Sequence, residues 1–79
     1  MDERILVAVY VPIVQLRFDM YLPLQAVLRE CMEACREYIE KKRCYHQEDI
    51  YLYHDNQLLS LDQSVKDSGL HTGSDIILL

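Results

Sequence analysis

Hydrophobic and polar positions divide the 79-residue chain into several short strands and one helix. Residues 5–11 form a nearly continuous apolar run rich in β-branched side chains, which predicts a strand buried on both faces. Pro12 interrupts this run, and residues 16–21 then alternate between apolar and polar side chains. That alternation predicts a second strand with one solvated face, at the edge of a sheet. The two strands are close enough in sequence to form a hairpin.

The next segment has the periodicity of an amphipathic helix. We predict that it begins at Pro23, because proline suits the first helical position, and that it ends near Lys41. Leu22 is a poor N-cap, so packing rather than capping is expected to hold the start of the helix. The predicted apolar stripe consists of Leu24, Val27, Leu28, Cys31, Cys35, Tyr38 and Ile39.

The second half of the chain predicts shorter elements. Residues 44–49 form a polar connection, residues 50–53 a third strand, and residues 57–60 a short fourth strand. Between the last two, Asp55 and Asn56 are typical of a tight turn.

The C-terminal residues predict a helical turn followed by a closing strand. Residues 64–67 match the pattern of a capping box, and Gly69 suits the left-handed position that ends a helical turn. Residues 71–74 predict another turn, and residues 76–79 a strand that is apolar on both faces.

The order of these elements predicts the architecture. The first and last strands lack a polar face, so we place both in the middle of the sheet, as parallel neighbours with the helix in the crossover between them. The expected fold class is α+β: a mixed four- to five-stranded sheet covering one amphipathic helix, plus a short helical turn. This is the β-grasp arrangement, formed here by a single domain over residues 1–79.

Residues 58–79 resemble the C-terminal half of ubiquitin-like domains. The shared pattern is a short strand, a Ser-Val turn at Ser64, Gly69-Leu, Gly73-Ser and a closing aliphatic strand. The N-terminal half, with Val7-Ala-Val-Tyr-Val-Pro12 and Arg17-Phe-Asp-Met-Tyr-Leu-Pro23 before a long helix, is most similar to the YukD/EsaB group. That group consists of bacterial ubiquitin-like proteins associated with type VII (ESX-type) secretion. The resemblance covers nearly the whole chain and implies an accessory or regulatory role in such a system.

Charge and composition exclude several classes of function. The chain has 8 basic and 13 acidic residues, a net charge of −5, which disfavours binding to nucleic acid or to an anionic lipid surface. The longest apolar run, residues 5–14, is too short to cross a bilayer of about 30 Å, and the first residues lack the positive charge of a signal peptide. Three cysteines without a framework spacing are consistent with a reducing compartment. We therefore expect a cytoplasmic protein, and the resemblance adds recruitment to a membrane-bound secretion complex.

The cysteines are the first candidates for chemistry. Cys31 and Cys35 are four residues apart on the predicted helix, but small buried thiols behave as hydrophobic side chains, so we expect them to pack in the core. Cys44 and His46 could be half of a zinc site. However, a structural zinc needs about four ligands, and no second pair occurs at a suitable spacing.

Other catalytic arrangements are also missing. His54 and His71 lie in predicted turns without the partners of a catalytic triad, so we expect surface histidines. The sequence therefore predicts a protein that is not an enzyme and has no catalytic residue, cofactor or metal site.

The sheet face away from the helix is the main candidate for function. Nothing in so small a domain remains to cover it, and tyrosine is a favoured residue at protein interfaces. The same face corresponds to the surface by which ubiquitin-like domains are usually bound. The competing interpretation is that scattered exposed apolar side chains are ordinary. The predicted interaction residues are Leu6, Ala8, Tyr10, Tyr51, Tyr53, Ile77 and Leu79.

The last residues bear on conjugation. A modifier or a sulfur carrier needs a flexible tail that ends in Gly-Gly, whereas this sequence ends at Leu79 in a predicted strand. We therefore expect a non-enzymatic interaction module that is not conjugated, and the resemblance to YukD/EsaB proteins implies that its partners are protein components of secretion machinery. A weak homo-oligomer remains open. The alternatives are a ubiquitin-like modifier or sulfur carrier whose tail is missing here, or the cytosolic domain of a membrane secretion component.

Overall fold

The structure is a computed structural model that describes residues 3–43 and 49–79. Cys44 and His46, and most of the predicted polar connection, lie outside the described residues. The described elements, in chain order, are β1 (Arg4–Val11), η1 (Pro12–Val14), β2 (Leu16–Pro23), α1 (Leu28–Arg43), β3 (Leu52–His54), β4 (Gln57–Leu58), η2 (Lys66–Ser68) and β5 (Asp75–Leu78).

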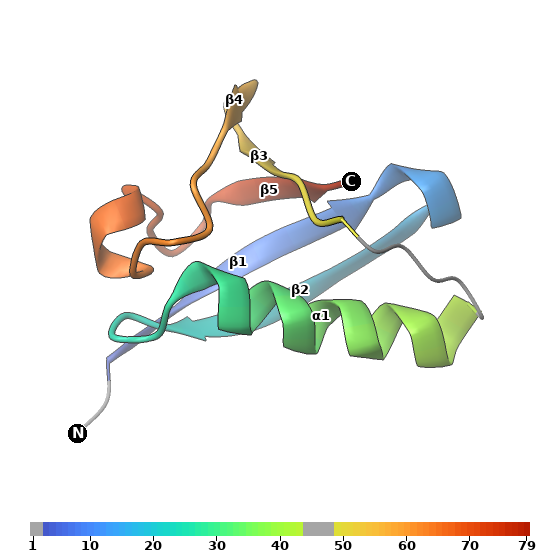
Figure 1. Cartoon of the computed structure of the whole chain (residues 1–79), viewed down its shortest axis with the longest axis horizontal. Coiled ribbons are helices and arrows are strands. Elements are labelled where there is room, and N and C mark those ends of the chain that lie inside the picture. Colours follow the sequence, from blue (N-terminus) through green and yellow to red (C-terminus); the bar gives the residue numbers. More distant parts are fainter. Residues whose placement is uncertain (1–2, 44–48) are drawn as a thin grey trace.

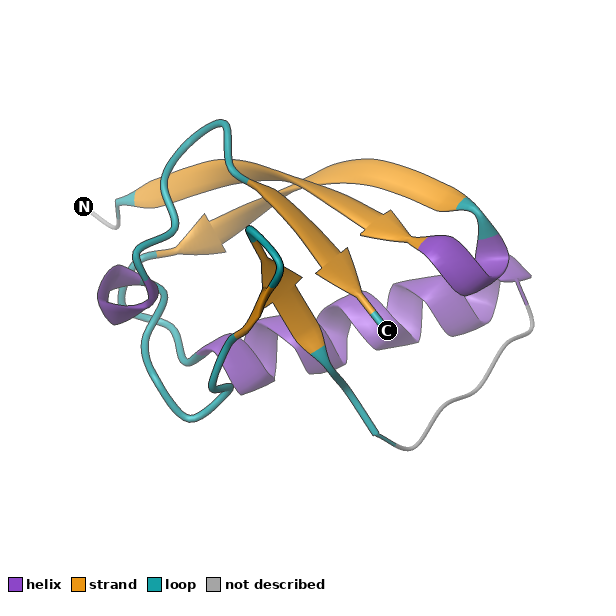
Figure 2. Cartoon of the chain, turned by 90° about the horizontal axis from the view of Figure 1, so that it is seen from above, coloured by secondary structure: helices purple, strands orange, loops and turns teal. Residues whose placement is uncertain are grey.

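The five strands form one mixed sheet in the order β2-β1-β5-β3-β4 (Figure 1). β1 pairs antiparallel with β2 and parallel with β5, and β3 is antiparallel to both β4 and β5. Figure 2 shows α1 lying across one side of the strands. The prediction that the first and last strands are parallel neighbours inside a mixed sheet is confirmed.

The β1–β2 hairpin is paired along its full length, from Arg4 opposite Pro23 to Val11 opposite Leu16. Its turn closes through Gln15, whose φ of 51° is left-handed. Side chains of β1 alternate between buried and half-buried positions. The prediction that β1 is buried on both faces is therefore wrong, because in residues 3–43 and 49–79 a layer, that of α1, packs on one face of the sheet and none on the other.

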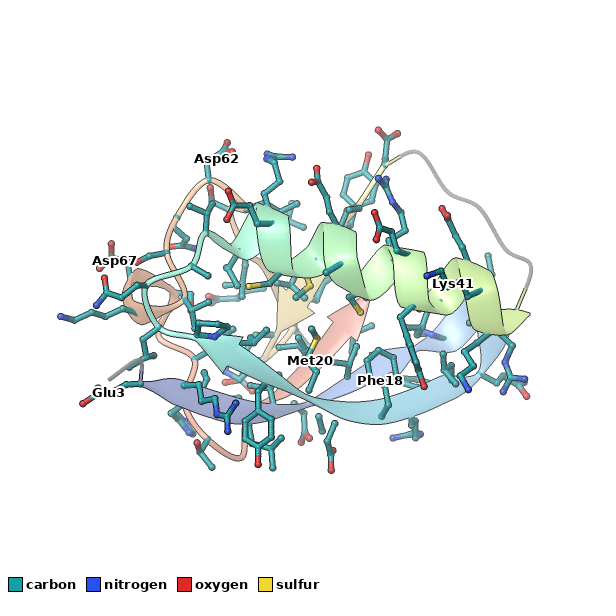
Figure 3. The ribbon with its side chains drawn as sticks, turned by 90° about the horizontal axis from the view of Figure 1, so that it is seen from below. Glu3, Phe18, Met20, Lys41, Asp62 and Asp67 are labelled. Carbon is teal, nitrogen blue, oxygen red and sulfur yellow. The ribbon has the colours of Figure 1, made fainter. Side chains whose placement is uncertain are left out.

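The core lies between α1 and the sheet. Figure 3 shows the helix side of the sheet, with Phe18 and Met20 of β2 beside the helix. The side chains that are almost completely removed from solvent come from both layers and from the segment before η2: Val7, Val9, Leu22, Leu28, Met32, Cys35, Leu52, Val65 and Ile76.

The helix begins at Leu28 and not at Pro23, which corrects the prediction. β2 continues to Pro23, and the N–H of Leu24 donates to the carbonyl of Glu3 at 2.9 Å. The residues that were predicted to form the first helical turn therefore belong to the hairpin and to the turn that follows it. Leu24 and Val27 are consequently not on the helix. At the other end, the described helix extends to Arg43, two residues past the predicted Lys41.

Backbone groups from a distant loop supply the missing helix cap. The first N–H groups of a helix have no partner within the helix. Here the N–H of Leu28 donates to the carbonyl of Gln63 at 2.9 Å, and that of Arg29 donates to the carbonyl of Leu61 at 3.0 Å. Val27 and Ser64 add an antiparallel bridge. The start of the helix is thus held by backbone hydrogen bonds to a distant loop, at a different position from the one for which the sequence predicted packing at Leu22.

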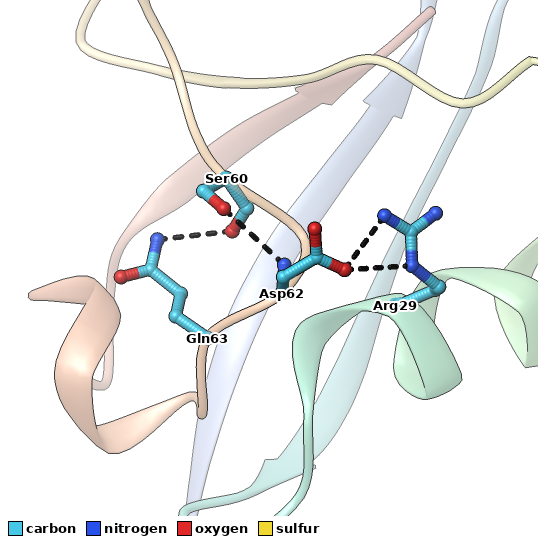
Figure 4. A network of polar contacts seen from close by, with 4 residues as sticks. All are labelled: Arg29, Ser60, Asp62 and Gln63. Atoms are coloured by element: carbon cyan, nitrogen blue, oxygen red, sulfur yellow. Dashed lines mark hydrogen bonds and ion pairs between the residues drawn. The ribbon is translucent and has the colours of Figure 1, made fainter.

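An exposed ion pair lies beside this junction (Figure 4). Both Nε and Nη2 of Arg29 donate to Oδ1 of Asp62, at 3.1 and 2.8 Å. The backbone N–H of Asp62 also donates to the Ser60 hydroxyl at 3.3 Å, and Nε2 of Gln63 donates to the Ser60 carbonyl at 3.0 Å. Because the two charged side chains are largely exposed, the ion pair contributes little, and the backbone bonds hold the helix start.

The short C-terminal elements follow the predicted order with different lengths. The hydroxyl of Ser64 accepts the N–H of Asp67 at 3.1 Å, and Gly69, with a φ of 85°, ends η2 in the left-handed conformation. β3 begins at Leu52 instead of residue 50, although Tyr51 and Leu79 still exchange two backbone hydrogen bonds of 3.0 and 2.8 Å. β4 contains only two residues.

Met32 should dominate the helix side of the core, because its side chain has no exposed surface. We expect Met32→Ala to lower the free energy of unfolding by about 2–5 kcal/mol, through lost contacts and the cavity left behind. Urea unfolding followed by circular dichroism measures this loss.

Two variants serve as controls for Met32→Ala. Met32→Leu keeps most of the volume and should cost less than about 1.5 kcal/mol, and Glu33→Ala, on the exposed side of the helix, should change stability by about 0.5 kcal/mol or less. Equal losses for Met32→Ala and Glu33→Ala would contradict the packing described above.

Candidate functional site

The sheet face opposite α1, called here the open face, contains all seven predicted interaction residues. Directly opposite residues in paired strands share a face. The register places Tyr10 opposite Ile77, and Ile77 opposite Tyr53, while Ala8 and Leu6 precede Tyr10 at the alternate positions of β1. Tyr51 and Leu79 form the next pair beyond Leu52 and Leu78, two positions from Tyr53 and Ile77, and so belong to the same face.

Exposure varies across the open face. Tyr51, Ile77 and Leu79 are the exposed members, at 45%, 37% and 42%, and they lie together where β3 meets β5. The other four predicted residues are half-buried. The accessible apolar surface therefore centres on the C-terminal part of β5.

Two large exposed side chains of the open face were missing from the predicted set. Tyr21 is 55% exposed, and Leu58, opposite Tyr53, is 58% exposed. The alternation of residues 16–21 already places Tyr21 on the solvated side of its strand, so the sequence held a signal for it. For Leu58 no such signal exists, because a two-residue strand has no readable alternation.

Arginines stack on two tyrosines of the open face. The guanidinium carbon of Arg17 lies 4.0 Å from the ring centre of Tyr10, and that of Arg4 lies 4.4 Å from the ring centre of Tyr21. Such contacts hold a planar cation against an aromatic face. They give the β1–β2 side of the open face a polar margin beside the apolar β3–β5 side.

A shallow open hollow of about 480 Å³ lies in the open face above Ala8. The side chain of Ala8 is small, and its neighbours on the paired strands have larger side chains. The molecular surface is therefore recessed at Ala8. The hollow's rim includes Tyr10, Arg17, Asp19, Asp75 and Ile77. This mixture of apolar, basic and acidic groups suits contact with a protein side chain.

The two described cysteines pack in the core, which confirms the prediction made for them. Burial raises the pKa of the Cys35 thiol to about 12. The pKa of Cys31 is also raised, first by burial and then by the nearby charge of Glu30. Both thiols therefore stay protonated and weakly nucleophilic at neutral pH.

The ring of each described histidine, His54 and His71, contacts a backbone carbonyl. Nδ1 of His54 lies 2.9 Å from the carbonyl oxygen of Asp75, and this side chain is half-buried instead of lying on the surface as predicted. Nδ1 of His71 lies 3.1 Å from the carbonyl oxygen of Thr72, in an exposed turn. Within residues 3–43 and 49–79, no three histidine, cysteine or acidic side chains come together in a group that could hold a metal ion.

Solved structures resemble this arrangement, although no protein-family model and no curated protein sequence matches the chain. A ubiquitin-like protein from Trypanosoma brucei superimposes with a TM-score of 0.75 at 21% identity, over 100% of this chain and 96% of that one. The fold is the ubiquitin-like β-grasp. At this level of identity, the likeness establishes the fold alone.

Two further solved structures, of different proteins, also resemble the fold. A chain of the ESX-3 core complex matches with a TM-score of 0.74 at 23% identity; the match covers 98% of this chain but 16% of that one. A chain of the toluene 4-monooxygenase HD complex with 4-bromobenzoate matches with a TM-score of 0.82 at 15% identity, over 96% of both chains. None of these matches distinguishes the YukD/EsaB group from other ubiquitin-like proteins. Among the described helices, none is long and apolar enough to cross a membrane.

The buried thiols generate a prediction about reactivity. In a Cys44→Ser background, native Cys31 and Cys35 should react with iodoacetamide at least about a hundredfold more slowly than in the urea-unfolded chain, because burial suppresses the thiolate. Mass spectrometry of the alkylated protein measures both rates. Native rates close to the unfolded rates would show that the helix does not bury these side chains.

Burial of Cys35 also predicts how stability depends on pH. Its folded pKa of about 12 lies above the ordinary value of 9.0, so ionisation favours the unfolded chain, and stability falls as pH rises from 9 towards 12. We expect a shallower fall for Cys35→Ala in this range, measured by urea unfolding. An identical slope in both proteins would contradict the assignment to this thiol.

Proposed function

We propose that the chain is a non-enzymatic, ubiquitin-like interaction module that binds protein partners through the open face. The observation that carries this proposal is the cluster formed by Tyr51, Ile77 and Leu79, three exposed apolar side chains side by side on paired strands. Aromatic and aliphatic anchors of this kind supply much of the binding energy of protein interfaces.

The rigidity of the surface supports the same function. Tyr51 and Leu79 exchange two backbone hydrogen bonds, and the neighbouring residues Leu52 and Leu78 are buried in the core. The exposed side chains therefore project from a fixed backbone. This protein consequently loses little conformational entropy when a partner binds. A preorganised flat surface fits a folded partner.

The hollow above Ala8 supplies a second element of recognition. Its polar margin, with Arg17 and Asp19 on β2 and Asp75 on β5, offers charged groups to the polar side chains of a partner. Polar groups around an apolar centre are typical of specific interfaces, in which the rim sets orientation and the centre supplies affinity.

We place this binding in a bacterial type VII-like secretion system, where the chain acts as an accessory or regulatory component on the cytoplasmic side. The strand and helix pattern similar to YukD/EsaB proteins supports this assignment, and so does the likeness to a chain of the ESX-3 core complex. The predicted partners are components of the secretion machinery.

A second candidate is that this chain is the ubiquitin-like domain of a larger membrane secretion component. The specific observation in its favour is the ESX-3 match, which spans only 16% of that chain. The reading frame in the native genome distinguishes the two: membrane-spanning segments continuous with this sequence would favour the second candidate.

Substitution of the open-face tyrosines tests the proposal. The double variant Tyr51→Ser, Tyr53→Ser should keep its secondary structure but reduce co-purification of the host's ESX-type membrane components at least about tenfold, because it removes central aromatic contacts. Quantitative mass spectrometry of tagged chain expressed in the native host measures the recovery.

Tyr38→Ser is the matched control for this experiment. Tyr38 is 42% exposed, close to the value for Tyr51, but it projects from α1 and packs against Phe18 on the other side of the sheet. Recovery should stay at the wild-type level for this variant. If the double variant recovers as much partner as the control, the open face is not the binding surface.

A further inference from the structure

The outer side of β2 forms one edge of the sheet. β2 is the first strand in the sheet order, eight residues long and paired without interruption to β1 on its inner side. In the part of the chain that the structure describes, no strand pairs with its outer side. Natural edge strands usually carry proline, a bulge or an inward charge that prevents pairing with another chain; β2 has a proline only at its last residue, Pro23, and residues 16–22 keep a regular register.

The register identifies which backbone groups point outward. The N–H of Leu24 donates to the carbonyl of Glu3, and bonded pairs alternate along an antiparallel ladder. Phe18 and the residues two positions either side of it therefore direct their backbone groups to β1. The backbone N–H and carbonyl groups of Arg17 and Asp19 point away from β1, towards the outer edge.

Side chains along this edge divide by face. Arg17 and Asp19 are exposed on the open face, whereas Phe18 and Met20 lie on the helix side (Figure 3). The ring of Phe18 packs against that of Tyr38, with centres 5.0 Å apart. A groove of about 330 Å³ between β2 and α1 runs beside these side chains.

The charge pattern of β2 is complementary to itself. If a second copy pairs antiparallel about a two-fold axis at Phe18, Arg17 of each copy lies directly opposite Asp19 of the other. Opposite residues share a face with Cβ atoms about 4.5–5.5 Å apart, close enough for two symmetric ion pairs. The same register brings the outward backbone groups of Arg17 and Asp19 into hydrogen-bonding positions and places the two Phe18 side chains together.

Other registers lose this complementarity. An axis at Asp19 would place two carboxylates against each other, and an axis at Met20 would put Arg17 opposite Pro23, which has no N–H to donate. The charges of Arg17 and Asp19, together with Pro23, therefore favour the register centred on Phe18. In the single chain Arg17 stacks on Tyr10, and because this stack is exposed, a carboxylate can compete for the guanidinium.

We propose that two copies of this chain associate through the outer edges of β2, antiparallel about Phe18, with Arg17 of each copy paired with Asp19 of the other. The two sheets then form one continuous sheet, with both helices on the same side. The open faces also become continuous, so the dimer presents the binding surface twice. This inference does not depend on the proposed function.

Charge reversal tests the interface by sedimentation equilibrium. Arg17→Glu places like charges opposite each other at both ion pairs, and Asp19→Arg does the same with the opposite sign. Each variant alone should dimerise at least about tenfold more weakly than the wild type. An equimolar mixture of the two should recover association to within about threefold of the wild type, because unlike charges then meet at both pairs.

Matched controls locate the effect at this edge. Arg4→Glu and Asp75→Arg reverse charges on the same face but on other strands, so both variants should dimerise like the wild type. Circular dichroism of every variant checks that the fold is retained. As a second readout, the amides of Arg17 and Asp19 should become protected from hydrogen exchange as the concentration of the wild-type chain rises.

Three results would overturn the proposal. The first is a wild-type chain that stays monomeric up to its solubility limit without concentration-dependent protection at β2. The second is a dimer that persists in both charge-reversal variants or is lost equally in the controls. The third is a mixture that fails to associate, which would show that Arg17 and Asp19 do not face each other.

Discussion

The parallel pairing of β1 with β5 beneath one helix is the constraint on which the rest of the structure depends. It joins the two ends of the described chain, and it buries Val9 and the directly opposite Ile76 against α1. The other strands extend the sheet from this pair: β2 on one side, and β3 followed by β4 on the other. Because α1 covers one side of the sheet, the same constraint leaves the open face without a covering layer among the described residues.

Much of this arrangement could be predicted from the sequence, because its strands have strong local patterns. Apolar β-branched runs at residues 5–11 and 76–79 predict central strands, and the structure places them side by side. The start of the helix could not be predicted in this way. Pro23 suits either a strand end or a first helical turn, and the bonds from Leu28 and Arg29 to the loop at residues 61–63 decide between them. Those bonds join residues more than thirty positions apart, so no local pattern reveals them.

For the candidate site, too, local sequence patterns predict some features, and contacts between residues far apart in sequence decide the others. Alternation along the strands correctly places Tyr10, Tyr51 and Ile77 on one face, but exposure depends on what packs around each side chain. Tyr10 is half-buried beneath the Arg17 guanidinium, whereas Leu58, in a two-residue strand, is among the most exposed apolar side chains. Met32 was missed in the core for a related reason: counting the turn residues Leu24 and Val27 as helical rotates the apparent apolar stripe away from it.

Chemical-shift mapping by NMR tests the central claim of this account most directly, namely that the uncovered side of the sheet is the binding surface. An isotope-labelled chain would be titrated with the purified cytoplasmic region of an ESX-type secretion component from its native host. The account predicts that the largest shifts fall on residues of β3 and β5, centred on Tyr51, Ile77 and Leu79. Shifts confined to the exposed side of α1, with β3 and β5 unchanged, would contradict it.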